Sequence, residues 1–197
     1  PFVILWSVGN EEWAVEHGEK GVEIARRMSE AVHGMDRTRP STYGNAGGPD
    51  LVKGVDVFGY NYIVQNPVDE YHRLYPEKCA VTDDCRSYTY REFYGLSRRV
   101  GSALARITGR GQAIGIYMEK NADAVAAFFG VQWAGCFYSV LNTELPGSRL
   151  NQIAEQLEPP VIVTCRELLP QAEEIFPGRN LCCFEDLARE EEDGEAL

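Results

Sequence analysis

AIGIYM at residues 113–118 and CFYSVL at residues 136–141 are short apolar runs, and ADAVAAFFGVQW at residues 122–133 lies between them. An apolar run of four to eight residues is typical of a buried strand, and Asn121 is a good N-cap for a helix over the middle segment. A strand, a helix and a second strand in this order predict a parallel βαβ unit. We therefore expect an α/β fold.

The same alternation of strands and helices extends in both directions from this unit. Residues 83–86 (Asp83-Asp-Cys-Arg86) predict the turn of a hairpin between residues 79–82 and 87–90. Helical spacing and apolar runs place the remaining elements. We expect helices at 19–35, 68–74, 90–107, 149–157 and 167–176, strands at 2–6, 55–62, 161–165 and 181–184, and an extended piece at 41–43.

The pattern changes at Tyr75-Pro-Glu-Lys78, and the chain divides there into two expected parts. Residues 1–78 and residues 79–188 are predicted to be separate α/β pieces. Residues 189–197 form an acidic tail, which we expect to be solvated and disordered because charged chain ends are seldom tied down.

Composition and charge exclude several classes of protein. The 197 residues include 30 Asp and Glu against 19 Lys and Arg, for a net charge of −11, and 44% of the residues are hydrophobic. This acidic balance argues against nucleic acid or an anionic membrane surface as the partner. No stretch approaches the ~20 apolar residues that a membrane span needs, and residues 1–6 lack the basic region and cleavage site of a signal peptide.

The cysteine pattern predicts free thiols. The six cysteines are at positions 79, 85, 136, 165, 182 and 183. They form no C-x-x-C pair and have no neighbouring His, so no zinc site is expected. We expect reduced cysteines and a cytoplasmic location.

Asn10 and Glu11 are the strongest chemical signal in the first part. They follow the apolar run at its carboxyl end, and in α/β barrels that rim gathers the catalytic groups. A carboxylic acid there can protonate a leaving-group oxygen if burial raises its pKa. The alternative is structural, because Glu11 and Glu12 could simply be acids at the start of a helix.

Four segments of residues 1–78 occur in the order of a known family. They are Val3-Ile-Leu-Trp-Ser-Val-Gly-Asn-Glu11, Asp36-Arg-Thr-Arg-Pro40, Asp56-Val-Phe-Gly-Tyr-Asn-Tyr62, and His72 with Tyr75-Pro76. Together they resemble the central barrel segment of glycoside hydrolase family 2, of the β-galactosidase and β-glucuronidase type. The resemblance implies an incomplete TIM-barrel segment and a carbohydrate ligand, provided that the segment is competent.

The same resemblance implies roles for particular residues. Glu11 would be the acid/base, and Asn10 would bind the sugar 2-hydroxyl. Tyr62 would steady the nucleophile, with Tyr60 as a competitor for that role.

The nucleophile itself is in doubt in this chain. A retaining glycosidase needs a second carboxylate about 5–5.5 Å from the first. Asp83 or Asp84 falls near the family's position, but Asp is one methylene shorter than the family's Glu, and such a misplacement can cost ~10²-fold in rate. We therefore expect no working glycosidase.

The second part resembles a different family. Pro76-Glu-Lys-Cys-Ala-Val81, Ser87-Tyr-Thr-Tyr-Arg-Glu-Phe93, Gly115-Ile-Tyr-Met-Glu-Lys120 and Phe129-Gly-Val-Gln-Trp-Ala-Gly-Cys-Phe-Tyr138 occur in its order. They resemble the N-terminal part of an adenylate-forming enzyme, most closely an amino-acid adenylation domain of the AMP-binding family. The resemblance implies the first part of a three-layer α/β domain.

The reactive parts of that family are not found in these residues. Its phosphate loop, its ribose-binding aspartate and its lid lysine have no counterpart, and Gly109-Arg-Gly111 is too short for a phosphate cradle. We expect no cofactor in this chain, with ATP and Mg²⁺ needed only by a complete parent.

Two unrelated resemblances in one chain predict a chimera. It could be a fused gene fragment, an assembly artefact or a designed sequence. We expect a fragmentary fusion without a complete active site. The alternatives are a weak retaining β-glycosidase that uses Glu11, and a non-catalytic acidic fragment that self-associates through open sheet edges.

Overall fold

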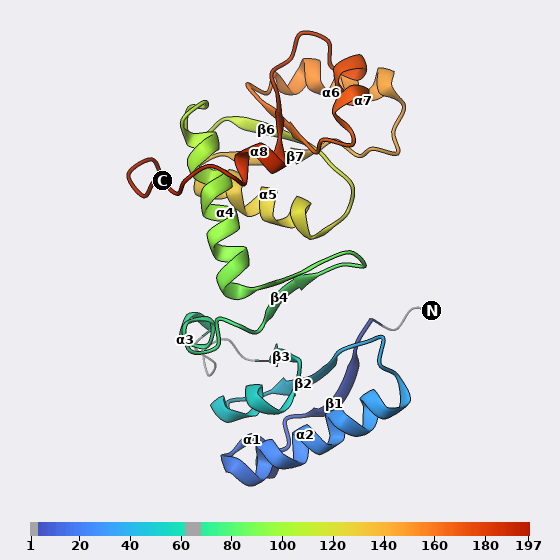
Figure 1. The fold of residues 1–197 in the computed structure, drawn as a ribbon, viewed down its shortest axis with the longest axis vertical. Helices are drawn as coiled ribbons and strands as arrows, with labels where there is room; N and C mark the ends of the chain where they lie inside the picture. The colour runs from blue at the N-terminus through green and yellow to red at the C-terminus, as the bar shows by residue number, and fades with distance from the viewer. Residues whose placement is uncertain (1–3, 62–67) are drawn as a thin grey trace. The chain divides into compact units, whose positions relative to one another are not determined.

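The computed structural model describes residues 4–61 and 68–197. The chain divides into two compact units, Pro1–Cys79 and Ala80–Leu197. Figure 1 labels the helices and strands of both units.

The first unit is a three-stranded parallel sheet with helices along the connections. The strand order is β1-β2-β3. The elements are β1 (Trp6–Asn10), α1 (Trp13–Glu16), α2 (Gly18–Met35), β2 (Ser41–Asn45), the 3₁₀ helix η1 (Pro49–Gly54), β3 (Val57–Tyr60) and α3 (Val68–Leu74). This arrangement does not test the barrel predicted for residues 1–78, which stays a prediction.

Helix α2 packs on the first sheet through small side chains. Gly21, Ala25 and Ser29 are buried at four-residue spacing, which places them on one helix face. The Ser29 hydroxyl is 2.6 Å from that of Ser41 on β2. The core of this unit therefore lies between α2, η1 and the sheet, around the buried ring of Tyr43.

The first strand does not lie where the apolar run predicts. Ile4 is 81% exposed, and the strand is Trp6–Asn10. Its position follows from the parallel ladder to β2, in which Trp6 pairs with Ser41. Hydrophobicity alone gave the wrong boundary because ladder pairing, and not apolar character, sets the ends of an edge strand. Residues 1–3 and the predicted site residue Tyr62 lie outside the described residues.

The second unit is a hairpin followed by a four-stranded parallel sheet of order β7-β6-β8-β9. The hairpin begins at the last residue of the first unit. The elements are β4 (Cys79–Thr82), β5 (Ser87–Thr89), α4 (Tyr90–Ala105), β6 (Ala113–Tyr117), α5 (Ala122–Trp133), β7 (Phe137–Val140), α6 (Gly147–Leu157), β8 (Ile162–Thr164), α7 (Leu169–Ile175), β9 (Leu181–Cys183) and α8 (Phe184–Leu187).

Helices cover both faces of this second sheet (Figure 1). Ile114 and Ile116 of β6 belong to an apolar cluster with α4, α5 and α8. Tyr117 belongs to a separate cluster with α6 and α7. Because neighbouring strand residues point to opposite faces, one strand supplies both cores. The unit is therefore the helix–sheet–helix α/β fold that the sequence predicts.

The helix starts and the α4–α5 contact follow from particular residues. Thr89 and Glu92 form a capping box at α4, and Asn121 caps α5 as predicted. A Cβ atom on Gly101 or on Gly130 would clash with the facing helix, at Trp133 and Val100 respectively. Glycine is needed at this crossing because the two helix backbones approach closely.

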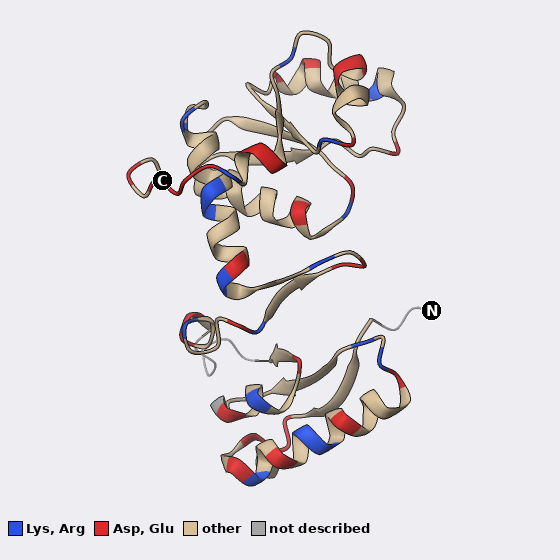
Figure 2. Ribbon diagram, viewed as in Figure 1, with Lys and Arg blue, Asp and Glu red and all other residues tan. Residues whose placement is uncertain are grey.

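Most residues of the acidic tail are exposed, as the sequence predicts, but the tail contacts α4 and is not a detached, disordered end. Glu192 pairs with Arg98 of α4 at 2.6 Å, and Glu190 pairs with Arg106 at 3.1 Å. In Figure 2, red segments near the C-terminus lie close to blue segments of α4. The contacts were not predicted because the sequence does not show the positive charges that folding brings to this segment.

Among the described helices, none has the length and apolar character needed to cross a membrane.

Candidate functional site

The carboxyl edge of the first sheet gathers three polar side chains. Asn10 and Glu11 stand at the end of β1, and Asn61 follows β3. The Asn61 Nδ2 donates to Asn10 Oδ1 at 2.9 Å and to Glu11 Oε1 at 2.6 Å. All three residues are exposed, so the cluster is open to a ligand.

Gly44 allows this contact across the middle strand. It lies on β2, between the strands that carry the three polar residues, and a Cβ atom there would clash with Asn10 and crowd Asn61. The cluster therefore depends on a glycine at the end of β2.

Glu11 has a strained backbone. Its φ is +52°, in the left-handed region that residues other than Gly, Asn and Asp seldom adopt. Its backbone N–H donates to the Gly44 carbonyl oxygen at 2.9 Å, which holds the residue in this conformation. Strain of this kind is concentrated at functional sites.

Buried polar contacts fix the loops behind the cluster. Glu16 is 1% exposed, and its carboxylate accepts hydrogen bonds from the backbone N–H groups of Ala46 at 2.9 Å and Gly47 at 3.2 Å. The Tyr43 hydroxyl accepts one from the N–H of Glu12 at 3.0 Å. Burial raises the pKa of Tyr43, so this hydroxyl stays neutral at physiological pH.

The structure therefore brings together two of the residues predicted from sequence, Asn10 and Glu11. Asn61 was missed, although it lies in the Asp56–Tyr62 motif that carried the resemblance. Tyr60, the competitor to Tyr62, instead packs on Phe58 and Tyr71, with ring centroids 5.0 and 5.6 Å away. The roles assigned to Glu11 and Asn10 stay predictions.

Asp83 has a structural role in the second unit. Its Oδ1 accepts hydrogen bonds from the N–H groups of Cys85 at 2.6 Å and Arg86 at 2.9 Å, and its Oδ2 accepts one from Ala122 at 2.7 Å. These three bonds lower the pKa of Asp83, the one from Ala122 most of all. Asp84 is exposed beside it. The proposed nucleophilic role of either residue stays a prediction of the resemblance alone.

The start of α5 is a possible anion site, but the chain's own carboxylates already occupy it. Asp83 binds its first N–H group, and Asp123 pairs with Arg86 at 2.8 Å and accepts from the Tyr88 hydroxyl at 2.6 Å. The Gly109 N–H donates to the side chain of Gln112 at 2.6 Å, which closes that turn. Over residues 4–61 and 68–197, no three His, Cys, Asp or Glu side chains are grouped to hold a metal. These residues do not fit a nucleotide phosphate or Mg²⁺.

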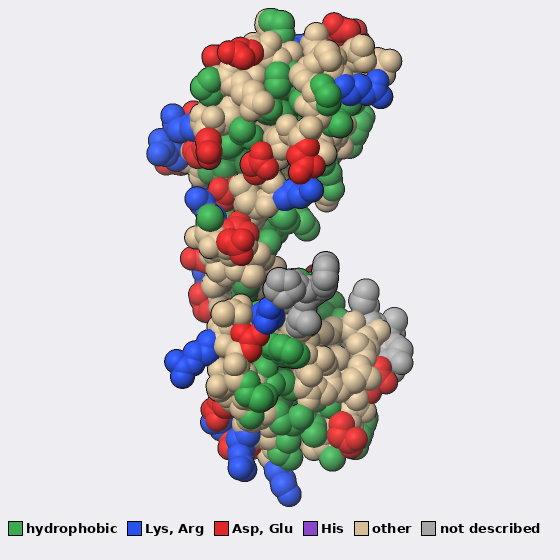
Figure 3. All heavy atoms as spheres, turned by 90° about the vertical axis from the view of Figure 1, so that its right-hand side faces the viewer, with side chains coloured by type: hydrophobic (Ala, Val, Ile, Leu, Met, Phe, Trp, Pro, Cys, Tyr) green, Lys and Arg blue, Asp and Glu red, His purple; other side chains and the backbone are tan. Residues whose placement is uncertain are grey.

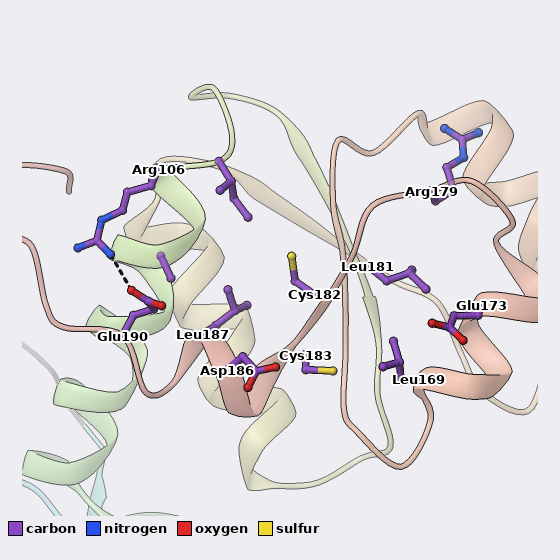
Figure 4. Close-up of a pocket in the computed structure, with 12 residues that line it drawn as sticks. Arg106, Leu169, Glu173, Arg179, Leu181, Cys182, Cys183, Asp186, Leu187 and Glu190 are labelled. Atoms are coloured by element: carbon purple, nitrogen blue, oxygen red, sulfur yellow. Dashed lines mark hydrogen bonds and ion pairs between the residues drawn. The ribbon is translucent and has the colours of Figure 1, made fainter.

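A cavity of about 740 Å³ lies beside β9, the last strand of the second sheet as the structure describes it (Figure 4). It is lined by Ala103, Arg106, Ile107, Leu169, Glu173, Arg179, Leu181, Cys182, Cys183, Asp186, Leu187 and Glu190. Burial raises the pKa of both thiols, which makes them weak nucleophiles. The lining contains no His that could act as a base, so the cavity offers space for binding and no evident chemistry.

Sequence comparisons match the second unit and the end of the first. A family model described as AMP-binding enzyme matches residues 68–195, which is more than half of the chain. An isonitrile lipopeptide synthase from Streptomyces coeruleorubidus is 31% identical over 86 residues, covering 43% of this chain and 6% of that protein. Syringomycin synthase SyrB1 from Pseudomonas syringae pv. syringae is 30% identical over 101 residues, covering 50% and 16%. The chain spans less than a fifth of either relative's length.

A comparison with solved structures also finds a similar fold. A crystal structure of the nonribosomal peptide synthetase FmoA3 with α-methyl-L-serine-AMP bound has a TM-score of 0.56 at 24% identity. The match covers 61% of this chain and 14% of that chain. At this identity the likeness concerns the fold alone.

Proposed function

Because this chain belongs to the AMP-binding enzyme family, we propose that its second unit is the N-terminal part of an adenylation domain that activates an amino acid. The observation that carries the proposal is the family match over residues 68–195. It is supported by the motif order in the sequence and by an isonitrile lipopeptide synthase among the relatives.

Within such a domain, the second unit would be scaffold. The polar groups at the start of α5 bind one another, and the two apolar clusters fill both faces of the sheet. ATP, Mg²⁺ and the amino acid would be bound by parts of a parent domain other than these residues.

The proposal can be tested with a hybrid adenylation domain whose activity is measured by ATP–pyrophosphate exchange. Residues 80–197 would replace the matching part of an active amino-acid adenylation domain, with the 197-residue chain alone as the control. We expect amino-acid-dependent exchange above background from the hybrid and none from the chain alone. A hybrid that is folded by circular dichroism but inactive would contradict the proposal, and exchange by the chain alone would contradict the scaffold role.

For the first unit we propose a remnant glycoside hydrolase segment in which Glu11 is the acid/base. The cluster of Asn10, Glu11 and Asn61 supports this, as does the backbone strain at Glu11. Protonation alone is worth only ~10²–10⁴-fold, so without a placed nucleophile turnover should be undetectable. Hydrolysis of a chromogenic β-galactoside or β-glucuronide that Glu11→Gln abolishes would show that the site is complete after all.

We also propose that the chain joins two unrelated parts, and that it is cytoplasmic. The division into compact units at Cys79 and Ala80 supports the first point, close to the predicted boundary at residue 78. The second is supported by the cysteines of the described part of the chain, among which no disulfide is seen. Separate expression of residues 1–79 and 80–197 would test the junction. If the two parts fold independently, the sum of their circular dichroism spectra should equal the spectrum of the whole chain.

Self-association through an open sheet edge is a further proposal, and β7 is the edge that favours it. Phe137 and Val140 on this strand are 55% and 52% exposed, and residues 124–143 carry no charged side chain. Hydrophobic side chains also reach the surface on the face drawn in Figure 3. Light scattering should report a dimer that Phe137→Lys disrupts, and a monomer at every concentration would count against it.

A further inference from the structure

The strand order of the second sheet reverses between β6 and β8. The chain passes from β6 to β7 on one side, and it then crosses back to place β8 on the other side of β6. The two connections run over opposite faces of the sheet, since α5 packs in one apolar cluster and α6 in the other. In open α/β sheets, ligands bind at the carboxyl ends of the two strands where the order reverses. In this unit those strands are β6 and β8.

Each of these two strands ends in a residue with a buried hydroxyl group. Tyr117 is the last residue of β6, and Thr164 is the last residue of β8. Both residues are 0% exposed. Within residues 4–61 and 68–197, their hydroxyls are the only buried side-chain nitrogen or oxygen atoms for which the protein offers no hydrogen-bond partner. Because folded proteins pair nearly all of their buried polar groups, the two hydroxyls require a partner that these residues do not supply.

The two hydroxyl-bearing side chains lie on the same face of the sheet. Tyr117 and Thr164 are register partners in the ladder between β6 and β8. Register partners leave neighbouring strands, which are ~4.7–4.9 Å apart, toward the same face. This is the face that α6 and α7 cover, because Tyr117 belongs to their apolar cluster and Phe176 packs edge-on against its ring. One small molecule between the sheet and these helices can therefore contact both hydroxyls.

The surroundings favour a neutral molecule over an ion. Burial raises the pKa of Tyr117, and Glu119 and Cys165 raise it further, so the hydroxyl keeps its proton at physiological pH. An ion would lose its hydration in this layer without a charged partner. A neutral O–H group donates and accepts, as each of the two hydroxyls does. The side chains that fill the layer are aliphatic: Leu141, Leu150, Ala154, Ile162 and Ala172.

We propose that the carboxyl ends of β6 and β8 form a binding site for one small neutral molecule with an O–H group, and that water occupies it in the purified chain. The molecule bridges the hydroxyls of Tyr117 and Thr164. Water is the occupant that fits, because both residues are closed to solvent and neither lines the cavity beside β9. The site is built from the second unit alone, so it does not depend on the proposed role in adenylation.

A double-mutant cycle in the full chain tests whether one molecule joins the two hydroxyls. The variants are Tyr117→Phe, Thr164→Val and the two together, and the measured quantity is the equilibrium constant for denaturant unfolding followed at Trp133. Each single variant should raise this constant at least about fivefold, because it breaks the bridge and leaves the other hydroxyl unpaired. The double variant should raise it several-fold less than the product of the two single effects, because no hydroxyl then remains. The matched control Tyr138→Phe, at a residue 38% exposed on β7, should change it by less than about twofold.

High-resolution crystal structures of the wild type and of the double variant identify the bound molecule. We expect one water about 2.5–3.0 Å from both hydroxyl oxygens in the wild type, and none at that position in the double variant. If a variant does not fold, the wild-type crystal structure still decides.

Several results would overturn the proposal. Single variants at least as stable as the wild type would mean that the hydroxyls are buried without a partner. Single effects that multiply fully in the double variant would mean that no molecule is shared. A wild-type crystal structure without a bridging water, or with an organic molecule in its place, would contradict the assignment directly.

Discussion

The carboxyl edge of the first sheet and the start of α5 in the second unit both carry polar residues but use them differently. At the first sheet, Asn10, Glu11 and Asn61 contact one another and solvent. In the second unit, Asp83 and Asp123 bind backbone N–H groups and neighbouring side chains at the start of α5. A polar cluster indicates a ligand site when its members are not already needed to close the fold, and only the first edge meets that condition.

Among the changes that test this comparison, a substitution in the core of the second unit should have the largest effect on stability. Phe176 is buried and packs edge-on against Tyr117, with ring centroids 5.5 Å apart. Phe176→Ala should destabilise this unit by about 3–5 kcal/mol, because it removes the ring and leaves a cavity. Denaturant unfolding followed at Trp133 should shift, while that followed at Trp6 and Trp13 should not. A shift of both signals by the same amount would show that the two units unfold together.

In the first unit, Glu16 should give the next largest effect. Glu16→Ala leaves the N–H groups of Ala46 and Gly47 without their acceptor, at a cost of about 1–3 kcal/mol. The tryptophan signals of the first unit should report it. Glu19→Ala, at an exposed position on α2, is the matched control and should be neutral. Equal effects of the two changes would contradict a structural role for the buried carboxylate.

The pH dependence of the second unit should reveal Asp83. Its pKa in the folded state lies below its ordinary value, so its ionised form stabilises the fold above the pKa of the unfolded chain, near 3.8. That stabilisation is lost as the pH falls through the folded pKa. Asp83→Asn should therefore be less stable than wild type at pH 7, and the difference should shrink below about pH 4. A difference that stays constant down to pH 2 would assign the effect to shape and not to charge.

The second unit could be predicted from sequence because its signals are local. The apolar runs at 113–118 and 136–141 and the cap at Asn121 each fix an element from neighbouring residues, and the structure has those elements within a few residues. The position of the segment at residues 188–197 could not be predicted in the same way. Its partners, Arg98 and Arg106, are about ninety residues away in the sequence, and only folding brings them near.

The first site was predicted in part for a related reason. Asn10 and Glu11 are adjacent and end an apolar run, which the sequence displays directly. Asn61 meets them only because three strands lie in chain order and Gly44 leaves room between the outer two. A contact that depends on a missing side chain in a third strand has no local signal.

The smallest expected change in stability comes from replacing Glu11. It tests whether the strained backbone at this residue stabilises the fold or holds the side chain in place for a functional site. A left-handed φ costs an L residue about 1–2 kcal/mol, and Gly avoids that cost but loses more entropy on folding. Glu11→Gly should thus stabilise the first unit by about 0.5–1 kcal/mol, whereas Glu11→Gln, which keeps the strain and an exposed side chain, should stay within about 0.5 kcal/mol of wild type. Thermal unfolding of the wild type and the two variants under the same conditions measures both changes in stability. If Glu11→Gly is instead the less stable variant, then the contact with Asn61 outweighs the strain, and Glu11 holds the loop together. If the glycine variant is more stable, the chain keeps a strained carboxylate at an exposed sheet edge where the fold does not need one, as expected for a residue placed for chemistry.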